Sequence, residues 1–98
     1  MNTLQEFLEH CRQHDAPDSS WSPPLQALWH AEKGNWERAH TLCQQGDLPD
    51  GAWVHANLHR EEGDLSNARY WYHRAGKPEC NLDIAAERHD IISRLLPG

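Results

Sequence analysis

Histidine is the residue type through which this chain could most directly do chemistry, since eight of its 98 residues are histidines. His55 and His59 are four residues apart, a spacing that places two imidazole rings on one face of a helix. Two such rings can supply two ligands to a zinc ion, which takes a third or fourth ligand as well. His30 occupies the position equivalent to His59 in an internal repeat. One interpretation is therefore a metal or small-molecule site formed by His30, His55 and His59.

The companions that would make this histidine pair a convincing metal site are missing from the sequence. In the metalloprotease motif a glutamate follows the first histidine, whereas Ala56 follows His55. We therefore favour a structural role, in which His30 and His59 fill space between helical hairpins and form hydrogen bonds there. On this interpretation we expect neither a bound metal nor a cofactor.

The cysteines give no sign of a zinc ribbon, a disulfide framework or a nucleophile. Cys11, Cys43 and Cys80 are odd in number and far apart, without a CxxC pair. A nucleophilic enzyme needs such a residue beside a placed base, and Cys43 falls on an expected core position. We expect reduced thiols in a cytoplasmic, non-catalytic protein. An enzyme that uses the histidine group is left open as the alternative.

A second group of polar and aromatic residues lies on one face of the helix expected over 65–75. Four of its members are spaced at i, i+3, i+4 and i+7, away from the positions expected to face the core: Asn67, Tyr70, Trp71 and Arg74. Tyrosine, tryptophan and arginine are enriched among the residues that dominate binding energy at protein interfaces. These four are candidate partner contacts. The alternative is that Trp71 packs on the last helix of the chain.

The net charge of -6 at pH 7 argues against non-specific binding to nucleic acid or to anionic lipid. Tyr70 and the basic residues around it could stack on and neutralise a single strand. However, the four basic residues in 53–79 are cancelled by four acidic ones. No stretch approaches a membrane span, and the N-terminus lacks the basic start and apolar run of a signal peptide. We expect neither a membrane nor a nucleic-acid partner.

The pattern of apolar residues predicts an all-α fold. Apolar residues recur at helical spacing, and no segment alternates with a period of two. Five tryptophans give this polar chain the large side chains that a core requires. Glycine, proline and capping residues divide the pattern into about six helices. The expected helices cover 3–14, 22–33, 36–45, 52–62, 65–75 and 81–96, with stops that include Gly34, Gly46, Gly63 and Gly76.

Two segments of this pattern repeat one another without gaps at an offset of 29 residues, with 27–36 aligned on 56–65. Alanine, histidine, glutamate and glycine are identical at four of the aligned positions, and Ala39 aligns with Ala68 further on. Small residues at a crossing allow two antiparallel helices to approach closely. The repeat therefore predicts two successive helical hairpins, over 22–46 and 51–77.

The second copy resembles a tetratricopeptide repeat. The turn at 63–65 is similar to the inter-helix turn of that family, and Ala68, Tyr72 and Ala75 stand at its small, aromatic and small positions. The copies are shorter than the usual repeat of about 34 residues, and His59 replaces a usual tyrosine. The resemblance implies one α-α superhelical domain over 1–98, in which helices within 1–15 and 81–96 cap the two hairpins.

Residues 58–76 are also similar to a small family of uncharacterised bacterial proteins, a likeness that implies no particular activity. The tetratricopeptide resemblance implies more, because the first helix of each hairpin in that family lines a concave binding surface. Mapping the repeat onto this chain places four candidate contacts on that surface: Trp53, Asn57, Arg60 and Glu61.

The chemistry of these candidates suits a protein partner. Arg60 can hold a carboxylate through its planar guanidinium. Trp53 either packs under a terminal helix or meets a partner, since a lone exposed tryptophan is costly. We therefore expect a non-catalytic interaction module that binds a peptide or protein, either an acidic segment or a second copy of this chain in a homodimer.

Overall fold

The expected all-α architecture is confirmed by a computed structural model, which describes residues 3–45 and 49–97. Within these ranges the chain forms six α-helices and no strand. The helices are α1 Leu4–Gln13, α2 Pro23–Glu32, α3 Trp36–Cys43, α4 Asp50–Glu61, α5 Leu65–Ala75 and α6 Ile84–Leu95. Among the described residues, no helix is both long and apolar enough to cross a bilayer.

Side-chain caps fix where most of these helices begin. The side chains of Thr3, Ser22, Asp64 and Asp83 each accept a hydrogen bond from a backbone N–H in the first turn of the helix that follows. Such caps satisfy donors that have no partner within the helix. Gly76 ends α5 in the left-handed conformation, with φ of 69°, which glycine adopts without steric cost.

Three helix ends differ from the sequence expectation by two or three residues. The third helix, expected to reach 45, ends at Cys43, and the fourth begins at Asp50 rather than at 52. The last helix, expected from 81, begins at Ile84, directly after its cap at Asp83. Pro49 precedes α4 directly, and proline is well tolerated at a helix start because its missing N–H has no intrahelical acceptor there. Gly46, the expected stop, and the first part of the expected loop, 47–48, lie outside the described residues.

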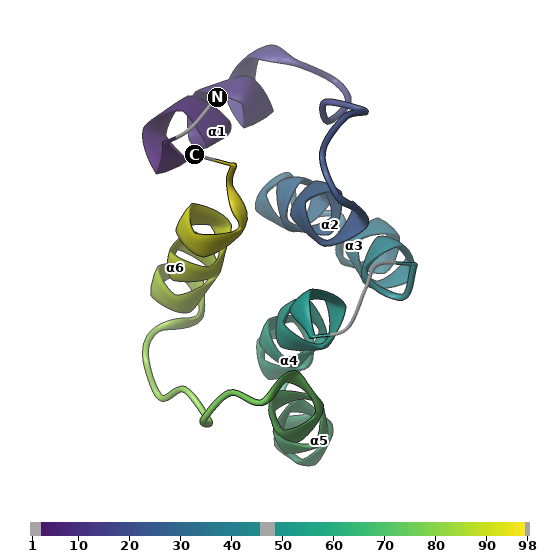
Figure 1. The fold of residues 1–98 in the computed structure, drawn as a ribbon, viewed down its shortest axis with the longest axis vertical. Coiled ribbons are helices and arrows are strands. Elements are labelled where there is room, and N and C mark those ends of the chain that lie inside the picture. Colours follow the sequence, from purple (N-terminus) through teal and green to yellow (C-terminus); the bar gives the residue numbers. More distant parts are fainter. Residues whose placement is uncertain (1–2, 46–48, 98) are drawn as a thin grey trace.

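The helices form two hairpins, and the chain then returns across their inner side. α2 packs on α3 and α4 packs on α5, with α2 and α4 also in contact with each other. α6 lies along the side formed by α2 and α4, and α1 covers the remaining end next to α2 and α6 (Figure 1). The outer helices α3 and α5 are on the opposite side from α6 (Figure 1).

Equivalent positions in the two hairpins share small residues but differ in what covers them. Ala27 and Ala56 are both fully buried, as helix crossings require. Trp36 of α3 donates its indole N–H to the backbone oxygen of Leu58 in α4, 2.8 Å away, and so joins the hairpins. Its equivalent on α5, Leu65, is 57% exposed. The difference follows from position, because no third hairpin packs against α5.

Candidate functional site

The four α4 residues expected to line an open concave surface lie beneath or beside α6 instead. Asn57 is fully buried, and Trp53 is only 8% exposed with the Lys77 ammonium 4.3 Å from its ring centroid. Arg60 and Glu61 are each paired with a charged residue of α6. The expectation of an open surface at these positions is therefore wrong. The repeat pattern placed these residues on the inner side of the hairpins, and α6 of the same chain covers that side.

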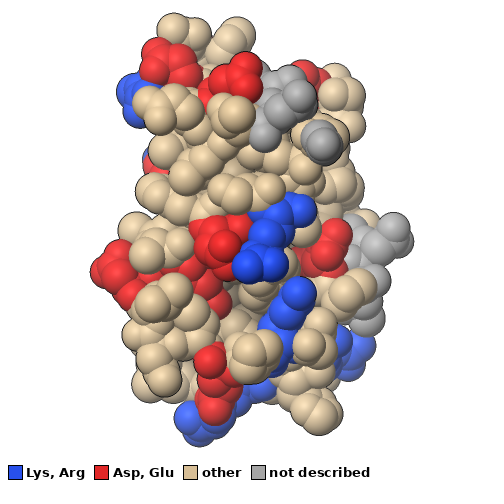
Figure 2. Space-filling view, turned by 60° about the vertical axis from the view of Figure 1, so that its left-hand side comes forward, with Lys and Arg blue, Asp and Glu red and all other residues tan. Residues whose placement is uncertain are grey.

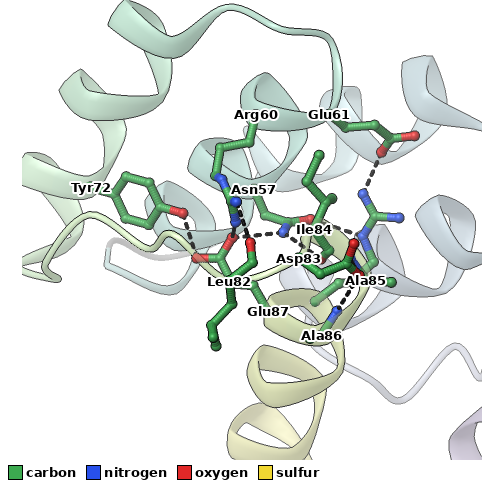
Figure 3. Close-up of polar contacts among 11 residues, drawn as sticks. Asn57, Arg60, Glu61, Tyr72, Leu82, Asp83, Ile84, Ala85, Ala86 and Glu87 are labelled. Carbon is green, nitrogen blue, oxygen red and sulfur yellow. Dashed lines mark hydrogen bonds and ion pairs between the residues drawn. The ribbon is translucent and has the colours of Figure 1, made fainter.

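Glu87 of α6 is the centre of the polar contacts that hold this arrangement (Figure 3). Its Oε1 accepts hydrogen bonds from Asn57 Nδ2 at 2.9 Å and from Arg60 Nη1 at 2.7 Å. Its Oε2 accepts the hydroxyl proton of Tyr72 at 2.5 Å. Burial, and next the hydrogen bond to Glu87, raise the pKa of Tyr72, so the phenol remains a donor at neutral pH.

Arg88, the next residue on α6, extends the contacts to the other side of Asn57. Its Nε donates to Asn57 Oδ1 at 2.9 Å, and its Nη2 donates to a carboxylate oxygen of Glu61. Asn57 therefore donates to one α6 side chain and accepts from the next. Both Glu87 and Arg88 are buried, at 3% and 7% exposure, and each has hydrogen-bonding partners of opposite charge, as buried ions require.

The second predicted group does form a continuous surface on the outer side of α5. Tyr70 is 52% exposed, and the guanidinium carbon of Arg74 lies 5.7 Å from its ring centroid and 5.5 Å from that of Trp71. Arg74 Nη1 also donates to the Tyr70 hydroxyl at 3.0 Å. Asn67 lies one turn earlier and donates to the capping carboxylate of Asp64. We call Tyr70, Trp71 and Arg74 the α5 outer surface.

Trp71 does not pack on the last helix, which was the alternative expectation. Its ring stacks on the imidazole of His55 in α4, with centroids 3.9 Å apart and an interplanar angle of 8°. One face of the Trp71 ring is thus covered by His55 of α4. The guanidinium of Arg74, which is on α5 like Trp71, lies over the rings of Tyr70 and Trp71. The stacking on His55 therefore fixes the orientation of the Trp71 ring within the α5 outer surface.

His55 belongs to a group of three imidazoles that differs from the predicted one in a single member. His40 of α3 lies beside His55 and His59, with ring centroids 4.8 and 5.4 Å away. His30, the expected third member, instead has its ring edge-on to Trp29, 5.0 Å between centroids. Both α2 and α3 contact α4, and the ring that lies against His55 and His59 comes from α3.

The surroundings of the three rings restrict their protonation and their orientation. The pKa of His55 is lowered to about 4, mainly by burial and next by His40 and His59, while a backbone hydrogen bond at Gly51 acts to raise it. His55 is therefore neutral at pH 7. Its Nε2 is buried and has no hydrogen-bond partner among the described residues. His59 Nδ1 lies 2.6 Å from a carboxylate oxygen of Glu62.

Two of the three cysteines, Cys11 and Cys43, are buried thiols. Burial raises the pKa of Cys11 to about 11 and that of Cys43 to about 12. Both side chains are therefore protonated at neutral pH, and the thiolate is the reactive form.

Comparison with models of protein families, with curated proteins and with solved structures gave no match. The candidate sites are therefore argued from their own geometry.

The contacts of Asn57 predict that it supports the fold. Asn57→Ala removes a donor to Glu87 and the acceptor of Arg88, so buried charged groups lose partners, and we expect a loss of about 2–4 kcal/mol in the free energy of unfolding. Urea denaturation measures this value. The matched control is Asn81→Ala, at an exposed asparagine, which should change stability by less than about 0.5 kcal/mol. Equal stability of the two variants would contradict the assignment.

The lowered pKa of His55 predicts a specific loss of stability in acid. Its ordinary pKa is 6.5, so between that value and about 4 the unfolded chain binds a proton that the folded chain does not. Stability must therefore fall as pH falls through this range, by about 2 kcal/mol at pH 5 relative to pH 7.5. In His55→Phe this part of the pH dependence should disappear.

Urea denaturation of metal-free protein at the two pH values measures the difference between wild type and variant. His73→Phe, at an exposed histidine of α5, controls for the substitution itself. If His55→Phe and wild type lose the same stability between the two pH values, then the burial of neutral His55 is not the cause of the loss of stability in acid.

Proposed function

We propose that this chain is a non-catalytic, tetratricopeptide-like protein-interaction module that binds its partner through the α5 outer surface. The observation that carries the proposal is the arrangement of Tyr70, Trp71 and Arg74, two aromatic rings and a guanidinium in mutual contact on one helix face. Residues of these three types are the ones most enriched at interface hot spots. The concave face, the other candidate, is covered by α6.

The chemistry of the surface favours an acidic peptide segment as the partner. Among the described residues Arg74 forms no ion pair, and its hydrogen bond is to the neutral Tyr70 hydroxyl. Arg94 and Arg69, by contrast, are paired with Asp90 and Glu79. A carboxylate of a partner can therefore bind the Arg74 guanidinium without displacing an internal carboxylate.

The distribution of charge supports a protein partner over nucleic acid. On the face drawn in Figure 2, basic and acidic side chains are interspersed, without a broad area of one sign. A nucleic-acid backbone needs a continuous positive surface to release its counterions.

The likeness to a small bacterial family and the three free cysteines support placing the protein in the bacterial cytoplasm, where thiols stay reduced.

The test is a selection of binding peptides from a random library displayed on phage, with affinities then measured by titration. We expect acidic peptides to be enriched, and we expect Tyr70→Ala and Arg74→Ala each to weaken binding by more than about 1 kcal/mol, roughly fivefold. Both side chains are exposed, so the melting temperature should stay nearly unchanged. Leu82→Ala, at an apolar residue that is 58% exposed elsewhere, is the control and should bind normally.

The same variants test self-association, the other occupant that the sequence allowed. Sedimentation velocity of wild type and Arg74→Ala over a range of concentrations shows whether a dimer forms and whether this surface makes it. Selected peptides that bind Tyr70→Ala and Arg74→Ala as tightly as wild type would place the binding site elsewhere and refute the proposal.

A further inference from the structure

Three imidazoles from two helices converge between the hairpins, in a group that touches the α5 outer surface where His55 stacks on Trp71. His40 is on α3, and His55 and His59 are one turn apart on α4. One nitrogen from each ring can be chosen so that all three lie within 4.8 Å of one another. The rings come from both sides of the α3–α4 contact, so the group exists only in the folded chain.

One nitrogen in this group is left without the partner that a buried polar atom requires. His55 is 3% exposed, and its Nε2 has no hydrogen-bond partner among the described residues. Native proteins rarely leave such an atom unsatisfied, and each case calls for an explanation such as an ion or a water molecule. The imidazoles of His40 and His59 lie beside this nitrogen. Together the three rings offer three nitrogen ligands to one metal ion.

The surroundings hold the rings in the way that metal-binding histidines are held. The Glu62 carboxylate binds His59 at Nδ1 and leaves its Nε2 available, the carboxylate–histidine arrangement that orients metal ligands. The ring of His40 stacks on Trp36, with centroids 4.9 Å apart, and His55 stacks on Trp71 at 3.9 Å. The indoles of Trp36 and Trp71 and the carboxylate of Glu62 thus restrict rotation of the three imidazole rings.

We propose that His40, His55 and His59 bind one divalent transition-metal ion, zinc being the best fit, with Glu62 orienting His59. Imidazole nitrogen suits zinc, copper, nickel and cobalt, whereas calcium and magnesium require oxygen ligands. Zinc–nitrogen bonds of about 2.0–2.1 Å place tetrahedral ligands roughly 3.3 Å apart, so binding draws the rings slightly together. Three protein ligands leave a fourth position for water or for a donor from another molecule.

This proposal reverses the expectation of no metal that the sequence favoured. The sequence supplied the pair His55 and His59 with His30 as a third member, whereas the structure puts His40 in that place and adds an orienting carboxylate and an unsatisfied nitrogen. The proposal does not rest on the function assigned to the α5 outer surface, although His55 stacks on Trp71 of that surface. A failure to bind peptides would leave the metal site standing, and a failure to bind metal would leave the interaction surface standing.

The first test is zinc titration of untagged protein that has been stripped with a chelator, in competition with a chromogenic zinc indicator. We expect one zinc ion per chain. His40→Gln, at the least buried of the three rings, should weaken binding by more than tenfold, and Glu62→Gln by about tenfold. His30→Gln is the matched control, since His30 stands at the repeat position of His59 but outside the group, and it should bind as wild type does.

Absence of stoichiometric zinc in the wild type, or equal affinity in His40→Gln and His30→Gln, would overturn the proposal. A second measurement does not depend on the folding of any variant. The visible spectrum of the wild-type cobalt complex should show the ligand-field bands of a four-coordinate nitrogen and oxygen site. An intense thiolate charge-transfer band in the near ultraviolet would assign the ion to a cysteine and refute the proposed ligands.

Discussion

Glu87 is a buried carboxylate on the last helix, and it accepts hydrogen bonds from Asn57, Arg60 and Tyr72 of the second hairpin. An ionised carboxylate is costly to bury unless its oxygens are paired and hydrogen-bonded, so these groups must come together in one arrangement. Satisfying Glu87 fixes the position of α6 across α4. The fully buried Ile91 and Ile92 of the same helix then complete the core. This placement closes the inner side of the hairpins.

Two helical hairpins alone would leave the apolar residues on their concave side exposed to solvent. Here the returning α6 covers that side, and α1 covers the end next to α2 (Figure 1). Closure of the inner side leaves the outer face of α5 for a partner, where Tyr70 and Arg74 are exposed. It leaves the three histidines between the hairpins, where α3 meets α4.

Local features of the fold could be predicted because they depend on residues close in sequence. Capping residues, glycine stops and the 29-residue repeat predicted the helices and their pairing. The position of α6 could not be predicted, because Asn57 and Glu87 are 30 residues apart and each looks like a solvated polar residue on its own helix. His40 was missed for a similar reason, although its spacing of four from Trp36 placed it on the face of α3 that joins the hairpins.

The central claim, that α6 is an integral part of the domain, is tested most directly by native-state hydrogen exchange. The backbone amides of Ile91 and Ile92 in α6 should exchange only through global unfolding, with the same opening free energy as those of Val54 and Leu58 in α4. Both pairs are fully buried. If the α6 amides exchange through an opening that costs at least about 2 kcal/mol less than global unfolding, then α6 detaches as a separate unit and the concave face is available to a partner.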